Sequence, residues 1–409
     1  MRRPAPRVAP RGGPRPLPLH LMSAATAWTS SLSAWQVWNN GSLDWNPALR
    51  QRANALAAAL ENEPPEAFAA ALRRQIAARA DAFLSGIERY RRHSYRRALP
   101  NPPEVWRQGT TRLLDYRPQG GAPILVVPSL INRGYILDLS GKKSLLRHLA
   151  RTGLRPFLVD WGSPGAEERT FDLTAYIAGR LEAAAEAAAS HGGARPAVLG
   201  YCMGGLLAVA LAQRRPDLLG ALALLATPWD FHAERAEQAR LLGRLVEPLA
   251  QICAPSGEVS VDILQMLFLA NDPLASARKF TGLAAIPRGG AEERDFVALE
   301  DWLNDGVPLA LPVAREALGG WYGENRPGLG QWRVAGRPVL PQEVTAPSLV
   351  IVPRQDRIVP PLTAAALADR LPRAERLDPP LGHIGMVVGR AAPREVWGKL
   401  ADWLKIHTG

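Results

Sequence analysis

Short runs of apolar residues recur along the chain from residue 123 onward. Each run is about six residues long, does not alternate with polar positions, and is bounded by proline, glycine or aspartate, which is typical of strands buried on both faces of a sheet. Helical patterns lie between them, most clearly over residues 172–189. Alternating strands and helices predict a parallel sheet with helices on both sides. The predicted strands are PILVVP (123–128), PFLVD (156–160), PAVLGY (196–201), ALALLA (221–226) and SLVIVP (348–353).

The chain before this alternating pattern has a different character. Proline and arginine dominate residues 1–19 without an apolar period, which predicts a disordered tail. Residues 20–105 predict a helical region, with a second helical stretch that begins after a proline near residue 65. Its first helix has one apolar face, which either docks on the catalytic domain or contacts a hydrophobic polymer or partner. That face consists of Leu21, Ala25, Trp28, Leu32 and Trp35.

Residues 229–340 interrupt the alternation of strands and helices. They contain several helical pieces and a stretch dense in tryptophan, glycine and proline, and strand patterns resume at residue 348. An insertion between two sheet strands is where such folds carry a cap over the active site. We therefore divide the chain into the tail (1–19), the helical N-terminal region (20–105), a catalytic domain (106–228 and 341–409) and a cap (229–340).

The sequence GYCMGG follows the third predicted strand and precedes a helix-compatible run. Glycines placed this way are typical of the sharp strand-to-helix turn that raises a nucleophile above the sheet of an α/β hydrolase. Cys202 stands where those enzymes commonly keep serine. The turn places its sulfur at a helix N-terminus, where the helix dipole favours the thiolate. We therefore predict an α/β-hydrolase fold with a cap insertion and a helical N-terminal extension, and Cys202 as the nucleophile.

In this fold the acid and the histidine of the triad follow the nucleophile along the chain. Asp356 comes directly after a predicted strand, and His383 lies in a glycine-flanked loop before the final helix. Either could be a structural residue, a helix cap or a loop histidine, but their order and positions favour a catalytic set. The backbone N–H of Met203 is one expected oxyanion donor, and Leu130 or Ile131 is the candidate for the second.

Composition narrows the class of protein. With only Cys202 and Cys253 a disulfide framework is excluded, and Cys253 is interpreted as a core residue. The apolar runs are far shorter than the roughly 18 residues that cross a bilayer, and the charged start lacks the apolar stretch of an export signal. We expect a cytoplasmic protein without a transmembrane segment.

The basic charge is concentrated near the N-terminus. The whole chain has a formal charge of +11, of which residues 1–107 supply +9 through 16 arginines against seven acidic residues. No motif for nucleic-acid binding accompanies this charge, so nucleic acid is not an expected partner. The basic face is either a solvated surface or a patch for an anionic ligand or surface.

Eight segments in fixed order resemble the polyhydroxyalkanoate synthases, and they run from about residue 105 to 390. The resemblance implies a cysteine nucleophile at Cys202 with Asp356 and His383 as its partners. It also implies substrate contacts at Trp302, which matches a tryptophan near the family's active site, and we assign substrate binding to Asn132 and Trp161 in two further matched segments. The segments are VPSLINRGYILDL, LVDWGSPG, GYCMGG, LATPWDF, WLND, WYGEN, QDRIVP and GHIG.

The activity implied by this resemblance is polymerisation of (R)-3-hydroxyacyl-CoA through a Cys202 thioester with release of coenzyme A. No cofactor or metal is implied, and coenzyme A is the leaving group rather than a cofactor. A thiol suits this chemistry, since transfer from one thioester to another keeps the acyl group activated. Pro361 and Leu362 replace an aromatic residue usual in the family, which leaves the substrate and the direction of reaction open.

Two other classes of function remain alternatives. One is a hydrolase of the same superfamily, either an intracellular polyhydroxyalkanoate depolymerase or an acyl-CoA thioesterase. The other is a non-enzymatic protein that binds polymer granules through the tryptophan-rich helix. The expected partners are hydroxyacyl-CoA and the polyester chain, with the granule surface as a hypothesis for the N-terminal region, and a homodimer is compatible with this assignment.

Overall fold

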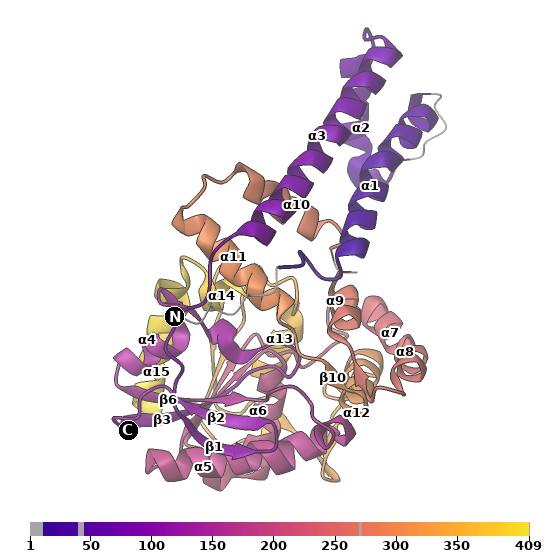
Figure 1. The fold of residues 1–409 in the computed structure, drawn as a ribbon. Helices are drawn as coiled ribbons and strands as arrows, with labels where there is room; N and C mark the ends of the chain where they lie inside the picture. Colours follow the sequence, from indigo (N-terminus) through magenta and orange to yellow (C-terminus); the bar gives the residue numbers. More distant parts are fainter. Residues whose placement is uncertain (1–10, 40–44, 270–271, 409) are drawn as a thin grey trace. The chain divides into compact units, whose positions relative to one another are not determined.

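The computed structural model describes residues 11–39, 45–269 and 272–408. The chain divides into two compact units, coloured along the sequence in Figure 1. The sheet unit comprises Arg96–Leu264 and Asp305–Gly409, and the helical unit comprises Met1–Tyr95 and Gln265–Asn304. Each unit is built from segments that are distant in sequence.

An eight-stranded sheet forms the centre of the sheet unit. Its first two neighbouring pairs are antiparallel and all the others are parallel. The predicted strands are confirmed, and those from β3 to β13 are almost wholly buried, as expected for strands covered on both faces. The strands in spatial order are β1 (Glu104–Gln108), β2 (Thr111–Asp115), β6 (Leu154–Asp160), β3 (Ala122–Val127), β7 (Ala197–Tyr201), β8 (Ala221–Leu225), β13 (Ser348–Ile351) and β14 (Ala374–Leu377).

Helices cover this sheet and bury its apolar strands. The apolar helix α6 follows β7 and packs against β3, β7 and β8, while α5 packs against β3 (Figure 1). The predicted helix over 172–189 begins as a π-helix, η3 (Ala175–Leu181), before it continues as α5. The other elements around the sheet are η1 (Gly134–Leu137), β4 (Asp138–Ser140), β5 (Lys143–Ser144), α4 (Leu145–Arg151), η2 (Glu168–Thr170), α5 (Glu182–Gly192), α6 (Met203–Arg214), η4 (Pro216–Leu218), η6 (Pro341–Glu343), α13 (Pro361–Ala368), α14 (Gly385–Val388), η7 (Pro393–Trp397) and α15 (Gly398–His407).

The predicted cap, residues 229–340, is divided between the two units. Residues 229–264 and 305–340 belong to the sheet unit, whereas 265–304 share a core with the N-terminal helices. The chain passes from the sheet unit to the helical unit within α9 (Val261–Leu269). The cap elements of the sheet unit are α7 (Ala236–Arg244), α8 (Val246–Cys253), β9 (Glu258–Val259), β10 (Leu309–Ala310), α12 (Leu311–Ala314), η5 (Arg315–Gly323), β11 (Arg333–Val334) and β12 (Arg337–Pro338).

The N-terminal helices and two helices from the predicted cap build the helical unit around an aromatic core. The Phe280 ring contacts Phe83 and Tyr90, with centroids 6.4 and 5.6 Å apart, and Trp28 packs edge-on against Phe83 at 6.0 Å. Its helices are α1 (Leu17–Asn39), α2 (Pro47–Leu60), α3 (Pro65–Arg92), α10 (Ala275–Ala285) and α11 (Ala291–Asn304). Among the described residues no helix is both long and apolar enough to span a membrane.

The N-terminal segment differs from its predicted description. Residues 11–19 of the predicted tail are held in place, since Arg11 donates hydrogen bonds to Asp301 and to the carbonyl of Tyr95 and α1 already starts at Leu17. Residues 1–10 lie outside the described residues. The predicted apolar face of α1 is half-buried at Leu21, Trp28, Leu32 and Trp35, whereas Ala25 is exposed.

Candidate active site

Cys202 occupies a strained turn between β7 and α6. Its backbone φ of 55° and ψ of −125° are rare for a residue with a side chain, and its N–H donates a 2.8 Å hydrogen bond to the Leu225 carbonyl. The glycines that follow are required by close contacts. A Cβ on Gly204 would lie 2.1 Å from the Val127 oxygen, and one on Gly205 would lie 1.8 Å from the Thr227 hydroxyl. The GYCMGG sequence therefore serves a turn that neighbouring strands enclose tightly.

Asp356 and His383 meet in the buried interior of the sheet unit. His383 Nδ1 lies 2.7 Å from Asp356 Oδ2, and the two residues are only 7% and 5% exposed. The other carboxylate oxygen of Asp356 accepts hydrogen bonds from the N–H groups of Ile358 and Val359 at 2.8 and 2.9 Å. The loop after β13 thus fixes the carboxylate, and the carboxylate fixes the imidazole.

The thiol of Cys202 completes this arrangement, because it lies within hydrogen-bonding range of His383. Burial by itself lowers the pKa of His383. The negative charge on Cys202 and the hydrogen bonds from His383 to Asp356 and Cys202 outweigh burial and raise the pKa of His383 to about 10. The geometry therefore favours an imidazolium next to the sulfur in the resting site.

Backbone donors for an oxyanion stand at the start of α6 and in the loop after β3. Met203 is the first residue of α6. Neither its N–H nor the Leu130 N–H has a hydrogen-bond partner among the described residues. The Ile131 N–H is already bonded to the Ser129 hydroxyl at 3.2 Å. Of the two candidates for the second donor, Leu130 therefore has the available N–H.

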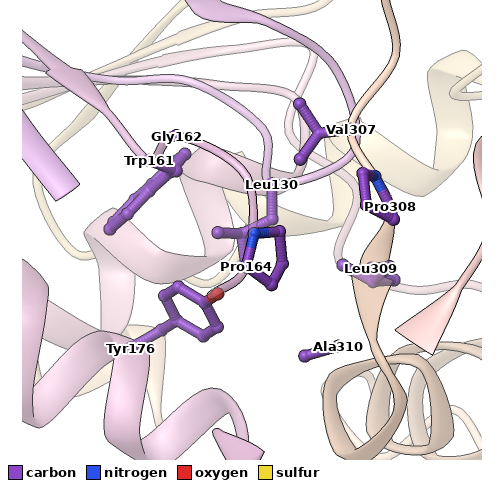
Figure 2. A pocket seen from close by; sticks show the side chains of 9 residues that line it. All are labelled: Leu130, Trp161, Gly162, Pro164, Tyr176, Val307, Pro308, Leu309 and Ala310. Carbon is purple, nitrogen blue, oxygen red and sulfur yellow. The ribbon is translucent and has the colours of Figure 1, made fainter. Parts of the chain in front are cut away.

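Trp161 is hydrogen-bonded to the loop that follows β3. Its indole N–H donates a 3.0 Å hydrogen bond to the Pro128 carbonyl, and its ring packs edge-on against Tyr176 with centroids 5.7 Å apart. Both rings and Leu130 border a cavity of about 10 Å³, which holds no more than one water molecule (Figure 2). The further lining residues are Gly162, Pro164, Val307, Pro308, Leu309 and Ala310.

The remaining predicted substrate residues have different settings. The Asn132 backbone pairs with Gly306 in an antiparallel bridge, and its side-chain oxygen is buried without a hydrogen-bond partner in the described part of the chain. Trp302 is buried in α11 of the helical unit. The structure thus brings Cys202, Asp356 and His383 together in the sheet unit, while substrate contact by the others stays a prediction.

Several residues around the site were not assigned a role from the sequence. The Tyr201 hydroxyl donates to the His383 carbonyl at 3.3 Å, and its ring lies 5.2 Å from the imidazole. Tyr322 packs against the same apolar core as Cys202. Tyr322 stands in the matched segment WYGEN, but the spacing of residues along the chain does not indicate which residues it contacts.

Comparison with known proteins agrees with this fold. The family model described as "alpha/beta hydrolase fold" matches residues 122–244. Three proteins named poly(3-hydroxyalkanoate) polymerase subunit PhaC are similar over about 70% of the chain. Those of Haloferax mediterranei, Synechocystis sp. and Allochromatium vinosum are 27%, 29% and 28% identical over 73%, 69% and 70% of this chain, and the matches span 62%, 77% and 83% of the relatives' own lengths.

The fold and the elbow at Cys202 define the class of protein. With its mostly parallel sheet, its strand-to-helix turn and its carboxylate and histidine after the later strands, the chain has the α/β-hydrolase fold. Its matched relatives are the proteins named poly(3-hydroxyalkanoate) polymerase subunit PhaC, to which the chain is similar at 27–29% identity.

Proposed function

We propose that this protein is an acyltransferase that polymerises (R)-3-hydroxyacyl units from their coenzyme A thioesters. The observation that carries the proposal is a cysteine, rather than a serine, at the elbow of an α/β hydrolase, within reach of a histidine that is 2.7 Å from a buried aspartate. The similarity to proteins named poly(3-hydroxyalkanoate) polymerase subunit PhaC supports the choice of substrate.

A thiol nucleophile favours transfer over hydrolysis. In the first step the Cys202 sulfur attacks the thioester carbonyl, the bond from carbon to the coenzyme A sulfur breaks, and the leaving thiolate takes a proton from His383. One thioester replaces another, so the acyl group stays activated. In the second step the hydroxyl of another hydroxyacyl group attacks the Cys202 thioester and gives its proton to His383. The bond from the acyl carbon to the Cys202 sulfur breaks, so an oxoester forms and the Cys202 thiolate is regenerated. The scheme uses no cofactor or metal.

The groups around Cys202 have separate roles in this scheme. His383 holds and moves the proton, first from the thiol and then from the incoming hydroxyl, and Asp356 orients its ring through the Nδ1 bond. The N–H groups of Met203 and Leu130 stabilise the negative oxygen of the tetrahedral intermediate. Asn132 and Trp302 remain proposed substrate contacts.

The products formed by the purified protein from (R)-3-hydroxybutyryl-CoA test this function. We expect release of coenzyme A together with insoluble polyester. Release of coenzyme A with free acid would identify a thioesterase, cleavage of preformed polymer alone would identify a depolymerase, and no reaction with either substrate would leave a binding protein. Each of these three results contradicts the proposed synthase.

We also propose that the protein works in the cytoplasm at the surface of polymer granules, which it contacts through its helical unit. Leu49 and Leu56 of α2 are 45% and 41% exposed and, seven residues apart, share a helix face. Arg50 and Arg52 lie beside them on α2 and suit a coat of anionic lipid. This support differs from the tryptophan face predicted from the sequence, because Trp28 packs against Phe83 within the unit.

Replacing both exposed leucines by serine tests the contact with granules. We expect Leu49→Ser/Leu56→Ser to leave turnover of soluble substrate unchanged and to lower the fraction of protein that sediments with isolated granules by at least about threefold, since apolar burial drives such binding. Leu241→Ser, at a 58% exposed leucine of the sheet unit, is the matched control. Equal loss in both variants would contradict this docking surface.

A further inference from the structure

His383 reaches the nucleophile from the edge of the sheet. Its loop follows the edge strand β14, whereas Cys202 follows β7, and β8 and β13 lie between these two strands. A 2.9 Å hydrogen bond from the Gln355 N–H to the Leu381 carbonyl fastens the start of this loop to the loop after β13. The imidazole, two residues further on, needs contacts of its own to stay at the sulfur.

Asp356 holds only one edge of this imidazole. Its Oδ2 lies 2.7 Å from Nδ1, which leaves Nε2 as the ring nitrogen that can face Cys202. A single hydrogen bond fixes the direction of Nδ1 but still allows the ring to tilt about that atom. Contacts on the face of the ring and on the main chain of His383 therefore decide where Nε2 points.

Tyr201 makes both of these contacts directly. Its hydroxyl donates a 3.3 Å hydrogen bond to the His383 carbonyl. The centroid of its ring lies 5.2 Å from that of the imidazole, and the angle between the two planes is 33°. This arrangement is closer to stacked than to edge-on, so the phenol ring covers one face of the imidazole.

The sheet fixes Tyr201 itself. Tyr201 is the last residue of β7, pairs in register with Leu225 of β8, and is 4% exposed. The N–H of the next residue, Cys202, donates a 2.8 Å hydrogen bond to the Leu225 carbonyl. The end of one strand thus carries the nucleophile and, in the residue before it, the side chain that contacts the base.

The Tyr201 hydroxyl is a neutral donor. Burial, and then the charges on Cys202 and Asp356, raise the pKa of Tyr201 well above its usual range. The phenol therefore keeps its proton at every working pH, and its uncharged ring face suits an imidazolium. The charged groups that act on His383 are the same two, Cys202 and Asp356.

On the basis of the proposed function, we propose that Tyr201 is a positioning residue that holds the His383 imidazole at the Cys202 sulfur. Its hydroxyl fixes the main chain of the histidine, and its ring keeps the imidazole from tilting away. Tyr201 acts through His383 and takes no part in the bond-forming steps. The elbow motif leaves the residue before the nucleophile unspecified, so this role goes beyond the motif.

Two substitutions in the full-length protein separate the ring from the hydroxyl. Tyr201→Phe removes the hydroxyl and keeps the ring, whereas Tyr201→Leu removes both. The readout is the rate constant for alkylation of Cys202 by iodoacetamide at pH 7, measured by mass spectrometry, which requires no polymerase activity. Because alkylation proceeds through the thiolate, which a nearby imidazolium stabilises, we expect Tyr201→Leu to lower the rate constant by about tenfold and Tyr201→Phe by less than about threefold.

The same substitution in a His383→Gln protein shows whether Tyr201 acts through the imidazole. Glutamine keeps the main-chain carbonyl but has no ring for Tyr201 to hold. We therefore expect Tyr201→Leu to change the alkylation rate constant of His383→Gln by less than about twofold. An equal change in both backgrounds would overturn the positioning role.

Turnover of hydroxyacyl-CoA supplies the second readout. We expect Tyr201→Phe to lower kcat by about threefold and Tyr201→Leu by at least about thirtyfold, with KM nearly unchanged, because a displaced base slows proton transfer without removing a substrate contact. A raised KM with unchanged kcat would make Tyr201 a substrate contact and contradict the proposal.

Tyr116 offers matched control variants in the same unit. Its hydroxyl also donates over 3.3 Å, to the Asp138 carboxylate, and the residue is half-buried. We expect Tyr116→Phe and Tyr116→Leu to keep the alkylation rate constant and kcat within about twofold of the wild type. Losses equal to those of the Tyr201 variants would assign the effect to general loosening of the unit and overturn the proposal.

The outcomes separate this proposal from the proposed function. A wild type that forms no polyester would contradict the function and leave the alkylation cycle as a complete test of Tyr201. Unchanged alkylation in Tyr201→Leu would overturn the positioning role whatever the enzyme makes. If Tyr201→Leu unfolds, as judged by circular dichroism, Tyr201→Met takes its place with the same expected result, because the flexible methionine side chain fills irregular space without a ring.

Discussion

Cys202 is the residue on which the proposed chemistry depends. We expect Cys202→Ala to abolish turnover while the free energy of unfolding stays nearly constant, because alanine is no more strained than cysteine at a φ of 55°. In the wild type, mass spectrometry after a brief reaction with substrate should find the acyl group on Cys202. Cys253 is 4% exposed and should remain unmodified. An acyl group on Cys253 would refute the assignment.

The raised pKa of His383 predicts how stability depends on pH. The ordinary value is 6.5 and the value in the folded site is about 10, so the folded protein holds a proton that the unfolded chain releases between them. This contribution is fully present below about pH 6.5 and is lost as the pH rises through about 10.

The melting temperature from about pH 7 to pH 10 measures this effect. We expect the wild type to lose more stability over this range than His383→Gln, which has no imidazole to titrate. In Cys202→Ala the negative charge that helps to raise the pKa of His383 is absent, so its loss should begin at lower pH. Parallel curves for the three proteins would show that the buried pair does not titrate in this way.

At this scale the sequence predicted which three side chains lie together better than it predicted the residues around them. Cys202, Asp356 and His383 were identified from order and from their places after strands, because covalent chemistry restricts the residue types that can serve. The sequence left Leu130 and Ile131 as alternatives for the second oxyanion donor. Only the structure shows that the Ser129 hydroxyl accepts the Ile131 N–H, which favours Leu130. The hydrogen bond from the Asn325 amide to the Asp230 carboxylate could not be predicted either, because neither residue type nor spacing links positions 95 residues apart.

Among the elements, the close approach of α6 to the residues that follow β8 leads to a testable prediction. A methyl group on Gly205 would meet the Thr227 side chain at 1.8 Å, so we expect Gly205→Ala to lower the free energy of unfolding by about 1 to 3 kcal/mol. Gly179→Ala, in η3, has no atom within 4 Å of the added group and should be neutral or stabilising. Denaturant titration of the three proteins compares them.

Adding Thr227→Gly to Gly205→Ala distinguishes a clash from a general effect on the helix. The nearest three atoms to the added methyl group all belong to the Thr227 side chain, so its removal should recover part of the loss. If the second substitution only adds to the destabilisation, the clash is not its cause.

The predictability of an element followed its burial. The central strands were identified because burial on both faces leaves a continuous apolar run. The strands β1, β2 and β14 were not, since the polar residues in EVWRQ, TRLLD and AERL interrupt any continuous apolar run. The helix of 172–189 was predicted correctly in place, but its π-helical start depends on packing that the residue pattern does not encode.

For the whole molecule, the division into two units is the feature that sequence patterns did not reveal. The predicted cap was treated as one insertion, yet residues 265–304 form their core with α3, nearly 200 residues earlier. The contacts responsible are between Phe280 and the rings of Phe83 and Tyr90. Apolar positions in either segment predict a buried face but do not say which partner buries it.

A buried ion pair joins the two parts of the helical unit and predicts that this unit can be weakened selectively. Arg89 Nε lies 2.6 Å from Glu293 Oε1, and the two side chains are 9% and 4% exposed. The same guanidinium donates to the carbonyls of Leu283 and Ile286 at 2.7 and 2.6 Å. Arg89 therefore caps carbonyl groups at the C-terminal end of α10 and also neutralises the Glu293 carboxylate on α11.

We expect Arg89→Met to lower the free energy of unfolding of the helical unit by about 3 kcal/mol, because it leaves the Glu293 charge buried without its partner. Hydrogen exchange should then increase in peptides from α3, α10 and α11 and stay unchanged in β7 and α6. Arg89→Met/Glu293→Leu should recover part of the loss. Equal acceleration of exchange in both units would show that they unfold as one.

The same pair predicts an acid limit for this unit. The hydrogen bond from Arg89 outweighs burial and holds the pKa of Glu293 below its usual 4.5. Its contribution to stability is thus present above about pH 4.5 and is lost as the pH falls through the lower value of the folded state. Exchange in α3 and α10 should accelerate on acidification in the wild type, and Arg89→Met should lack this step because Glu293 no longer has the donor that lowers its pKa. An equal acid step in both proteins would assign the sensitivity to other carboxylates.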